Sequence, residues 1–143
     1  MSKIYVHYGS SKFNKKAFIP IRNGGMNKPI GGLWASDDTA KYGWRDWNSD
    51  SRFRECVESL SFRFTLTPAA RVLTISSDEQ AQEFIFEFSG STNALRIDWE
   101  TVKEYFDAVE VLVSDDYRLY WTLYGWDCDS IVILNPDVIV PIE

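Results

Sequence analysis

Residues 31–47, GGLWASDDTAKYGWRDW, combine features that ordinary core or loop sequence does not. Two glycines precede a short apolar segment, and a tyrosine and three tryptophans then lie close to Ser36 and the aspartates that follow it. Interior glycine weakens strands and is used where another backbone or a ligand approaches closely. We predict a short buried strand at 32–36 and a short helix at 36–47, with Ser36 or Asp37 as its N-cap. The aromatic side chains either line a pocket or only pack in the core.

Strand and helix signals extend from this stretch in both directions. Alternation or continuous β-branched residues predict strands at 3–8, 59–67, 70–76, 129–135 and 138–142. Helical spacing and capping residues predict helices at 76–88 and, capped by Asp98, at 96–113, while 115–126 is ambiguous. With no internal repeat and no linker, residues 1–143 are predicted to form a single α+β domain with two or three short helices.

The composition is that of a folded, acidic chain. Hydrophobic residues make up 45% of the 143 residues, charged residues make up 25%, and the net charge is −6. An acidic surface disfavours non-specific binding to nucleic acid, which depends on basic side chains. No apolar run reaches the length of a membrane span, and the first residues lack the apolar core of a signal peptide. We therefore expect a cytoplasmic protein that does not insert into a membrane.

Cysteine, histidine and lysine counts narrow the chemistry further. Cys56 and Cys128 are expected to be free thiols, because no secretion signal accompanies them. Two cysteines and one histidine are too few for a structural zinc site, so no metal is predicted. Basic residues gather early in the chain, where they form either a solvated face or a site for a small anionic ligand. They are Lys12, Lys15, Lys16, Arg22 and Lys28.

Three short motifs follow one another in a recognisable order. HYGS at 7–10 ends the first strand, GLWAS at 32–36 precedes a segment that contains a tyrosine, and DCD at 127–129 precedes a β-branched strand. Together they resemble the ADP-ribosyltransferase superfamily, in its histidine–tyrosine–acid branch of diphtheria-toxin-like and poly(ADP-ribose) polymerase-like enzymes. The resemblance spans residues 5 to about 134. It implies a split mixed or antiparallel β-sheet core flanked by two or three short helices, with NAD as the ADP-ribose donor.

The first motif supplies four residues that the resemblance assigns to NAD. His7 resembles the histidine that hydrogen-bonds the adenosine ribose, although Tyr8 stands where the family more often has glycine. Gly9 would offer backbone atoms to the nicotinamide carboxamide, and Ser10 would complete this edge of the site. A lone histidine beside aromatic residues is otherwise a satisfied core residue.

The second motif supplies the aromatic walls that the resemblance implies. Gly32, Leu33 and Trp34 match a glycine–aliphatic–aromatic strand, with Trp34 where the family usually has tyrosine. Tyr42 resembles the second aromatic residue, which stacks on the other side of the nicotinamide ring. Ser36 falls where the family often has a hydroxyl that supports the catalytic acid. We expect the two later tryptophans of the stretch to support this pocket rather than line it.

The third motif supplies the candidate acids. Cleavage of the bond between nicotinamide and ribose develops positive charge on the sugar, which a fixed carboxylate stabilises. The family uses glutamate, whereas the chain has Asp127 and Asp129, whose side chains are shorter by one methylene. We assign the catalytic role to Asp129 and expect Asp127 to face the acceptor. The alternative is that this acidic pair only forms a turn.

The resemblance therefore predicts an NAD-dependent mono-ADP-ribosyltransferase that modifies a host or cellular macromolecule, in the manner of a small phage or bacterial effector against a defence factor. We expect a protein acceptor in preference to nucleic acid, and the oligomeric state is left open. The alternative is a catalytically inactive protein of the same fold that inhibits a partner by occlusion. An RNA 2′-phosphotransferase on this scaffold would need a basic phosphate site, for which the sequence offers no clear set.

Overall fold

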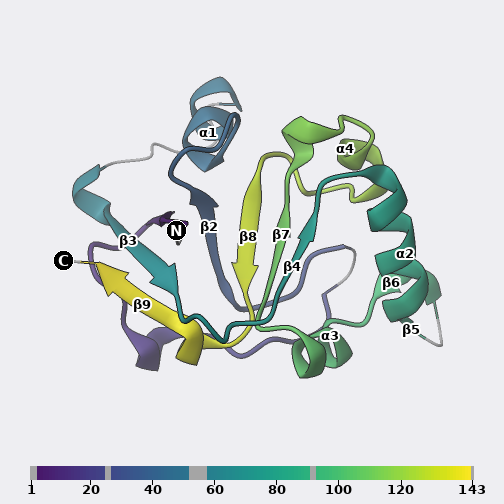
Figure 1. The fold of residues 1–143 in the computed structure, drawn as a ribbon, viewed down its shortest axis with the longest axis horizontal. Helices are drawn as coiled ribbons and strands as arrows, with labels where there is room; N and C mark the ends of the chain where they lie inside the picture. The colour runs from purple at the N-terminus through teal and green to yellow at the C-terminus, as the bar shows by residue number, and fades with distance from the viewer. Residues whose placement is uncertain (1–2, 25–26, 52–57, 91–92, 143) are drawn as a thin grey trace.

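The computed structural model describes residues 3–24, 27–51, 58–90 and 93–142. Over these residues the chain forms a mixed seven-stranded sheet in the order β4-β7-β8-β2-β1-β3-β9 (Figure 1). The strands are β1 Tyr5–Tyr8, β2 Leu33–Asp37, β3 Ser61–Leu66, β4 Val72–Ile75, β7 Ala108–Val111, β8 Ser130–Ile133 and β9 Ile139–Ile142. Strands β4 and β7 pair in parallel, and the other neighbours in the sheet pair antiparallel. A separate ladder joins β5 Ser89–Gly90 to β6 Asn93–Ile97.

Helices cover one face of the sheet on the side of β4, β7 and β8. The α-helices within the described residues are α1 Trp44–Ser51, α2 Asp78–Phe88, α3 Trp99–Tyr105 and α4 Leu119–Thr122, and the last three cover this face. In Figure 1, α2, α3 and α4 lie on the right-hand side of the molecule, while α1 lies above the ends of β2 and β8. Phe84, Trp99 and Trp126 pack there against Val109 and Val132 in one buried cluster. The chain is thus a single α+β domain, as predicted.

The sheet divides at its centre. Strands β1 and β2 pair only through Tyr5↔Asp37 and Val6↔Ser36. Beyond these pairs β1 stays with β3 as far as Tyr8↔Ser61, whereas β2 pairs with β8 along Leu33–Ala35. The two halves of the sheet therefore separate at the end of β1 and the start of β2.

Each predicted strand range overlaps a strand in the structure, and the helix at 76–88 is confirmed. That helix begins after Ser77, whose side chain accepts a hydrogen bond from the Gln80 backbone N–H. The ambiguous segment 115–126 contains the single-turn helix α4. The described residues contain no helix with both the length and the apolar character needed to cross a membrane.

Two predicted helices are wrong in part. The helix expected at 36–47 starts only at Trp44, because the Asp37 carboxylate accepts hydrogen bonds from Thr39 and holds a turn there. The segment 96–113 holds the end of β6, then α3, then the strand β7. Asp98 does cap α3. All of β7 is buried, and its β-branched residues favour a central strand over a helix.

Candidate functional site

A cleft of about 610 Å³ opens where β1 and β2 separate. Its apolar side chains come from both halves of the sheet, from α1 and from the segment after β1: Phe13, Ala17, Phe18, Ile19, Leu33, Trp34, Trp44 and Phe62. Its polar side chains are His7, Tyr8, Ser10, Lys12, Asn14 and Asn48. This size and a mostly aromatic lining with a few polar groups are typical of sites for small organic ligands.

Histidine 7 presents one ring nitrogen as a hydrogen-bond acceptor. Its Nδ1 lies 2.7 Å from the carbonyl oxygen of Trp34 and donates to it, since a carbonyl only accepts. Burial lowers the pKa of His7 below its usual 6.5, so the ring is neutral at neutral pH. Nε2 then carries no proton and can act as a hydrogen-bond acceptor. The Phe62 ring, centred 5.2 Å away, supports the imidazole.

Trp34 and Trp44 are the aromatic pair of the cleft. Their ring centroids lie 6.2 Å apart and their planes meet at 76°. The backbone N–H of Trp44 donates to Ser36 Oγ at 2.9 Å, and Ser36 Oγ donates to the carbonyl of Asp129 at 2.7 Å. Ser36 therefore fixes the start of α1, and with it Trp44, relative to β2 and the beginning of β8.

The expected role of Tyr42 does not match its position. Tyr42 is not among the described residues that line the cleft. Its hydroxyl donates to Asp50 at 2.9 Å, on the exposed side of α1. Trp44, which we expected only to support the pocket, lines it together with Trp34. The second aromatic side chain of the cleft after Trp34 is therefore Trp44, two positions beyond Tyr42.

Asp129 is anchored inside the protein. Its side chain is only 3% exposed, and Oδ1 accepts from the Ser114 backbone N–H at 2.7 Å. Oδ2 accepts from Ser114 Oγ at 2.6 Å and from the Tyr42 N–H at 3.3 Å. It does not line the cleft with Trp34. Asp129 directly precedes β8, and β2 separates β8 from β1, which carries His7.

Asp127 lies beside the aromatic pair instead. It borders a narrow space of about 20 Å³ together with Trp34, Trp44 and Trp47. Trp34 and Trp44 line both this space and the cleft, so Asp127 lies behind the pair. The same space is bordered by Lys28, whose Nζ lies 5.4 Å from the ring centroid of Trp34. In the sequence, Lys28 was only one of several early basic residues, and no local signal tied it to this site.

The remaining predicted residues divide into two groups. Tyr8, Ser10, Gly32 and Leu33 line the cleft, as expected for ligand-contacting positions. Gly9 lies beside it and donates its N–H to the Leu60 carbonyl at 2.7 Å, so this N–H is not available to a carboxamide.

Gly32 is required by its surroundings. It has a φ of +79°, and an added Cβ would lie 2.9 Å from the carbonyl oxygen of Ile133. Gly32 therefore allows β2 to begin close to the backbone of β8 at the edge of the cleft.

Several other expectations concern cysteines and metals. Cys128 is a buried free thiol whose pKa burial raises to about 12, and Cys56 lies outside the described residues. Over the ranges that the structure describes, no cluster of three or more His, Cys, Asp or Glu side chains could hold a metal ion.

In comparisons with known proteins, the chain matches no family model, no curated protein and no solved structure.

Proposed function

We propose that the protein is an NAD-dependent mono-ADP-ribosyltransferase. The observation that supports this most strongly is one cleft, between two separating strands, that brings together a neutral His7 acceptor and the Trp34–Trp44 pair. A dinucleotide with a cationic aromatic ring needs both features: an acceptor for a ribose hydroxyl and an aromatic wall for the ring. The separation of the sheet between β1 and β2 also agrees with the split core that the sequence resemblance implies.

The polar residues of the cleft suit the rest of the donor. His7 Nε2 would accept a hydrogen bond from the adenosine ribose, and Lys12, with Ser10 beside it, would face the pyrophosphate. Among the basic residues early in the chain, Lys12 is the one that lines the cleft. Its ammonium would attract an anionic group of the ligand near the end of β1.

Asp127 takes the catalytic role in this proposal, because it borders the narrow space that shares Trp34 and Trp44 with the cleft, whereas Asp129 is committed to its anchoring hydrogen bonds. The bond between nicotinamide nitrogen and ribose C1′ breaks, and its electron pair leaves with nicotinamide, which becomes neutral. The Asp127 carboxylate stabilises the positive charge left on the sugar. The acceptor then forms a new bond at C1′ and loses its proton to solvent. Asp129 is a positioning residue that holds the start of β8.

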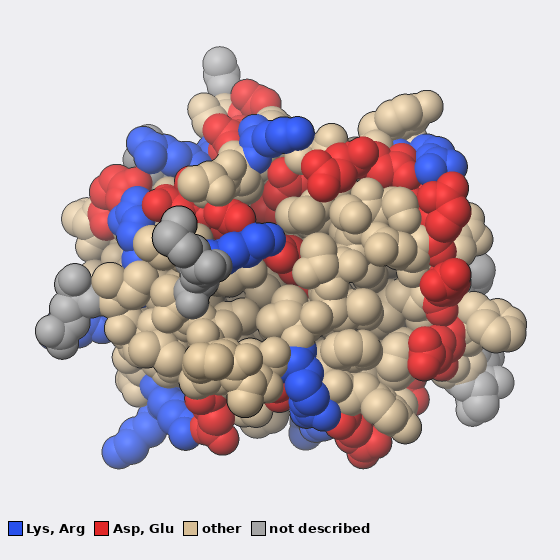
Figure 2. Space-filling model, in the orientation of Figure 1, with Lys and Arg blue, Asp and Glu red and all other residues tan. Residues whose placement is uncertain are grey.

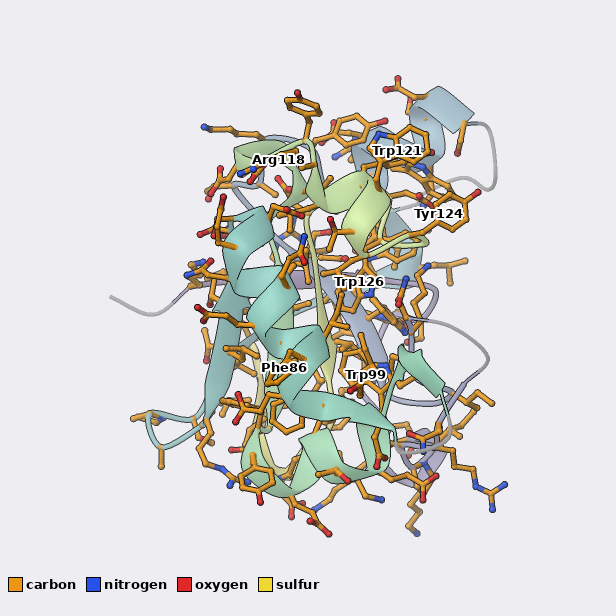
Figure 3. All side chains as sticks on the ribbon, turned by 90° about the vertical axis from the view of Figure 1, so that its right-hand side faces the viewer. Phe86, Trp99, Arg118, Trp121, Tyr124 and Trp126 are labelled. Atoms are coloured by element: carbon orange, nitrogen blue, oxygen red, sulfur yellow. The ribbon has the colours of Figure 1, made fainter. Side chains whose placement is uncertain are left out.

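The surface of the protein supports a protein acceptor over nucleic acid. Acidic side chains form a band across the top and right edge of the face shown in Figure 2, in keeping with the net charge of −6. Around α4, Tyr117, Trp121 and Tyr124 are 80%, 70% and 52% exposed. Figure 3 shows Trp121 and Tyr124 pointing outward while Trp126 points into the molecule. Exposed aromatic side chains of this kind are typical of protein–protein contacts. Tyr117, Trp121 and Tyr124 also lie shortly before Asp127 in the chain.

A second function follows from the burial of Asp129. If the acid that the family resemblance places at this motif is held by Ser114 and Tyr42, the domain could bind NAD or a partner without transferring ADP-ribose. Such a protein would inhibit its partner by occlusion.

The test is incubation of the protein with NAD labelled in its adenylate group and with bacterial lysate, read by gel and mass spectrometry. A transferase labels a discrete acceptor band, and Trp44→Ala labels it far less because one aromatic wall is lost. Labelling that is absent, while the protein still captures a partner, would support the occluding protein instead.

A further inference from the structure

The aromatic pair of the cleft already holds a cation from the chain itself. The Lys28 ammonium lies 5.4 Å from the ring centroid of Trp34 and 6.0 Å from that of Trp44. Both distances are within the range in which a cation is attracted to an aromatic face. Lys28 borders one narrow space together with the two tryptophans and Asp127, and only about 20 Å³ of that space is left open.

Lys28 is held in this position by contacts of its neighbour. The side chain of Asn27 donates to the Tyr124 carbonyl at 3.0 Å, and the Asn27 carbonyl accepts from Trp126 Nε1 at 3.1 Å. These bonds fasten the segment around Lys28 to the chain just before Asp127.

The path of the lysine side chain depends on a glycine. Gly125 has a φ of +105°, and a Cβ added there would lie 3.6 Å from Lys28 Cε. The Lys28 side chain thus runs past the bare backbone of Gly125 to reach Trp34 and Trp44. The backbone beside Lys28 is fixed by the hydrogen bonds of Asn27, and the ammonium end of its side chain contacts two aromatic rings. The conformation of Lys28 is therefore determined by its surroundings.

We propose that the Lys28 ammonium competes with a cationic ring of the ligand for the faces of Trp34 and Trp44. A flat cation can enter the narrow space that Trp34, Trp44 and Asp127 border only when the Lys28 ammonium leaves it, since the space left there is about 20 Å³ and two like charges in it repel each other. Lys28 thereby sets the affinity of the site for positively charged rings. The identification of that ring as the nicotinamide of NAD rests on the proposed function, whereas the competition itself does not.

Charge, more than shape, decides the effect of replacing Lys28. Lys28→Met keeps an unbranched side chain that is one atom shorter and removes the ammonium, so a cationic ring gains the aromatic faces without a competing charge. Lys28→Arg keeps a cation over the rings and should bind cations as weakly as the wild type. Lys16→Met, at an exposed lysine of the 3₁₀ turn Lys15–Ala17, is the matched control for loss of one positive charge.

The experiment titrates these proteins with 1-methylnicotinamide, a cation without phosphate, and with neutral nicotinamide, following quenching of tryptophan fluorescence. Lys28→Met should bind 1-methylnicotinamide about tenfold more tightly than the wild type, with a much smaller gain for nicotinamide. Lys28→Arg and Lys16→Met should match the wild type. Circular dichroism of each variant checks its fold.

Two results would overturn the inference: unchanged or weaker binding of 1-methylnicotinamide by folded Lys28→Met, or an equal gain for the neutral ring. The same experiment, together with an assay of NAD cleavage, distinguishes failure of this inference from failure of the proposed transferase function. If Lys28→Met binds the cation more tightly but no form of the protein cleaves NAD, Lys28 is still the competitor and the ligand is another organic cation.

Discussion

The Asp129 carboxylate and the Ser114 hydroxyl meet at 2.6 Å, and the same carboxylate accepts the Ser114 backbone N–H at 2.7 Å. This pair joins the start of β8 to the 3₁₀ turn Val113–Asp115 that follows β7. The backbone N–H of Asp129 donates in turn to the Tyr42 carbonyl at 2.7 Å. One buried aspartate thus ties together three segments around the cleft, which is the role of a structural anchor.

Replacing Asp129 should therefore destabilise the fold. Asp129→Ala leaves the Ser114 and Tyr42 donors without their acceptor, and a lost hydrogen bond to a charged group costs about 2–3 kcal/mol. We expect the free energy of unfolding in urea to fall by about that amount or more. Asp127→Ala, at a partly exposed position, should change it by less than about 1 kcal/mol. Equal losses in the two variants would show that Asp129 is not an anchor.

The assignment of the second aromatic wall can be tested by ligand-induced stabilisation. NAD should raise the melting temperature by an amount that grows with the logarithm of its concentration. Trp44→Ala should remove most of this shift, because it deletes one wall of the cleft. Tyr42→Phe should keep the shift, since it removes only the hydroxyl bound to Asp50. The opposite result would restore Tyr42 to the site that the sequence motif gave it.

The protonation state of His7 predicts how NAD binding depends on pH. Burial lowers the pKa of His7 below 6.5, so Nε2 stays an acceptor as the pH falls from 8 to 6.5. NAD affinity, measured by calorimetry, should be constant over this range and should drop only when the pH passes below the lowered pKa.

The same shift has a consequence for stability with a defined sign. Since the unfolded chain binds the His7 proton first, the stability contributed by the buried neutral ring is present above pH 6.5 and is lost as the pH falls through the folded pKa. His7→Asn should remove this component of acid sensitivity and should also weaken NAD binding. A drop in affinity that begins near pH 8 would contradict a neutral, buried His7.

The exposed aromatic surface around α4 should serve the acceptor and not the donor. Trp121→Ala removes a side chain that is 70% exposed, and it leaves the cleft unchanged. We expect transfer to the protein acceptor to fall about tenfold or more, in line with loss of an aromatic contact at an interface. Release of nicotinamide from NAD by water should stay at the wild-type rate. A parallel loss of both activities would mean that Trp121 supports the cleft itself.

The sequence predicted the strands well because their patterns are local. The alternation of 59–67 and the β-branched run of 129–135 each identify a strand without knowledge of its partners. Segment 96–113 misled because α3 and β7 follow each other closely, and the spacing of Ile97, Val102, Phe106 and Val109 continues a helical pattern into the strand.

The site was predicted less well, for physical reasons that no single motif contains. His7 and Trp34 could be placed because they belong to strands whose ends meet at the cleft, and Gly32 directly precedes one of these strands. The anchoring of Asp129 could not be predicted from the sequence, because its hydrogen-bond donors lie 15 and 87 residues away in the chain. The position of Lys28 depends on the fastening of Asn27 to Tyr124 and Trp126, which is visible only in three dimensions.

Release of nicotinamide from NAD by the purified protein, followed by chromatography, tests the central claim most directly. The wild type should release nicotinamide well above the rate in buffer, and Asp127→Asn should lower that release by about a hundredfold or more, because the amide keeps the shape and removes the charge. Asp115→Asn, at an exposed aspartate near the same end of the sheet, should leave the rate unchanged. Release by the wild type that does not exceed the buffer rate, or an unaltered rate in Asp127→Asn, would contradict NAD cleavage by Asp127 at this cleft.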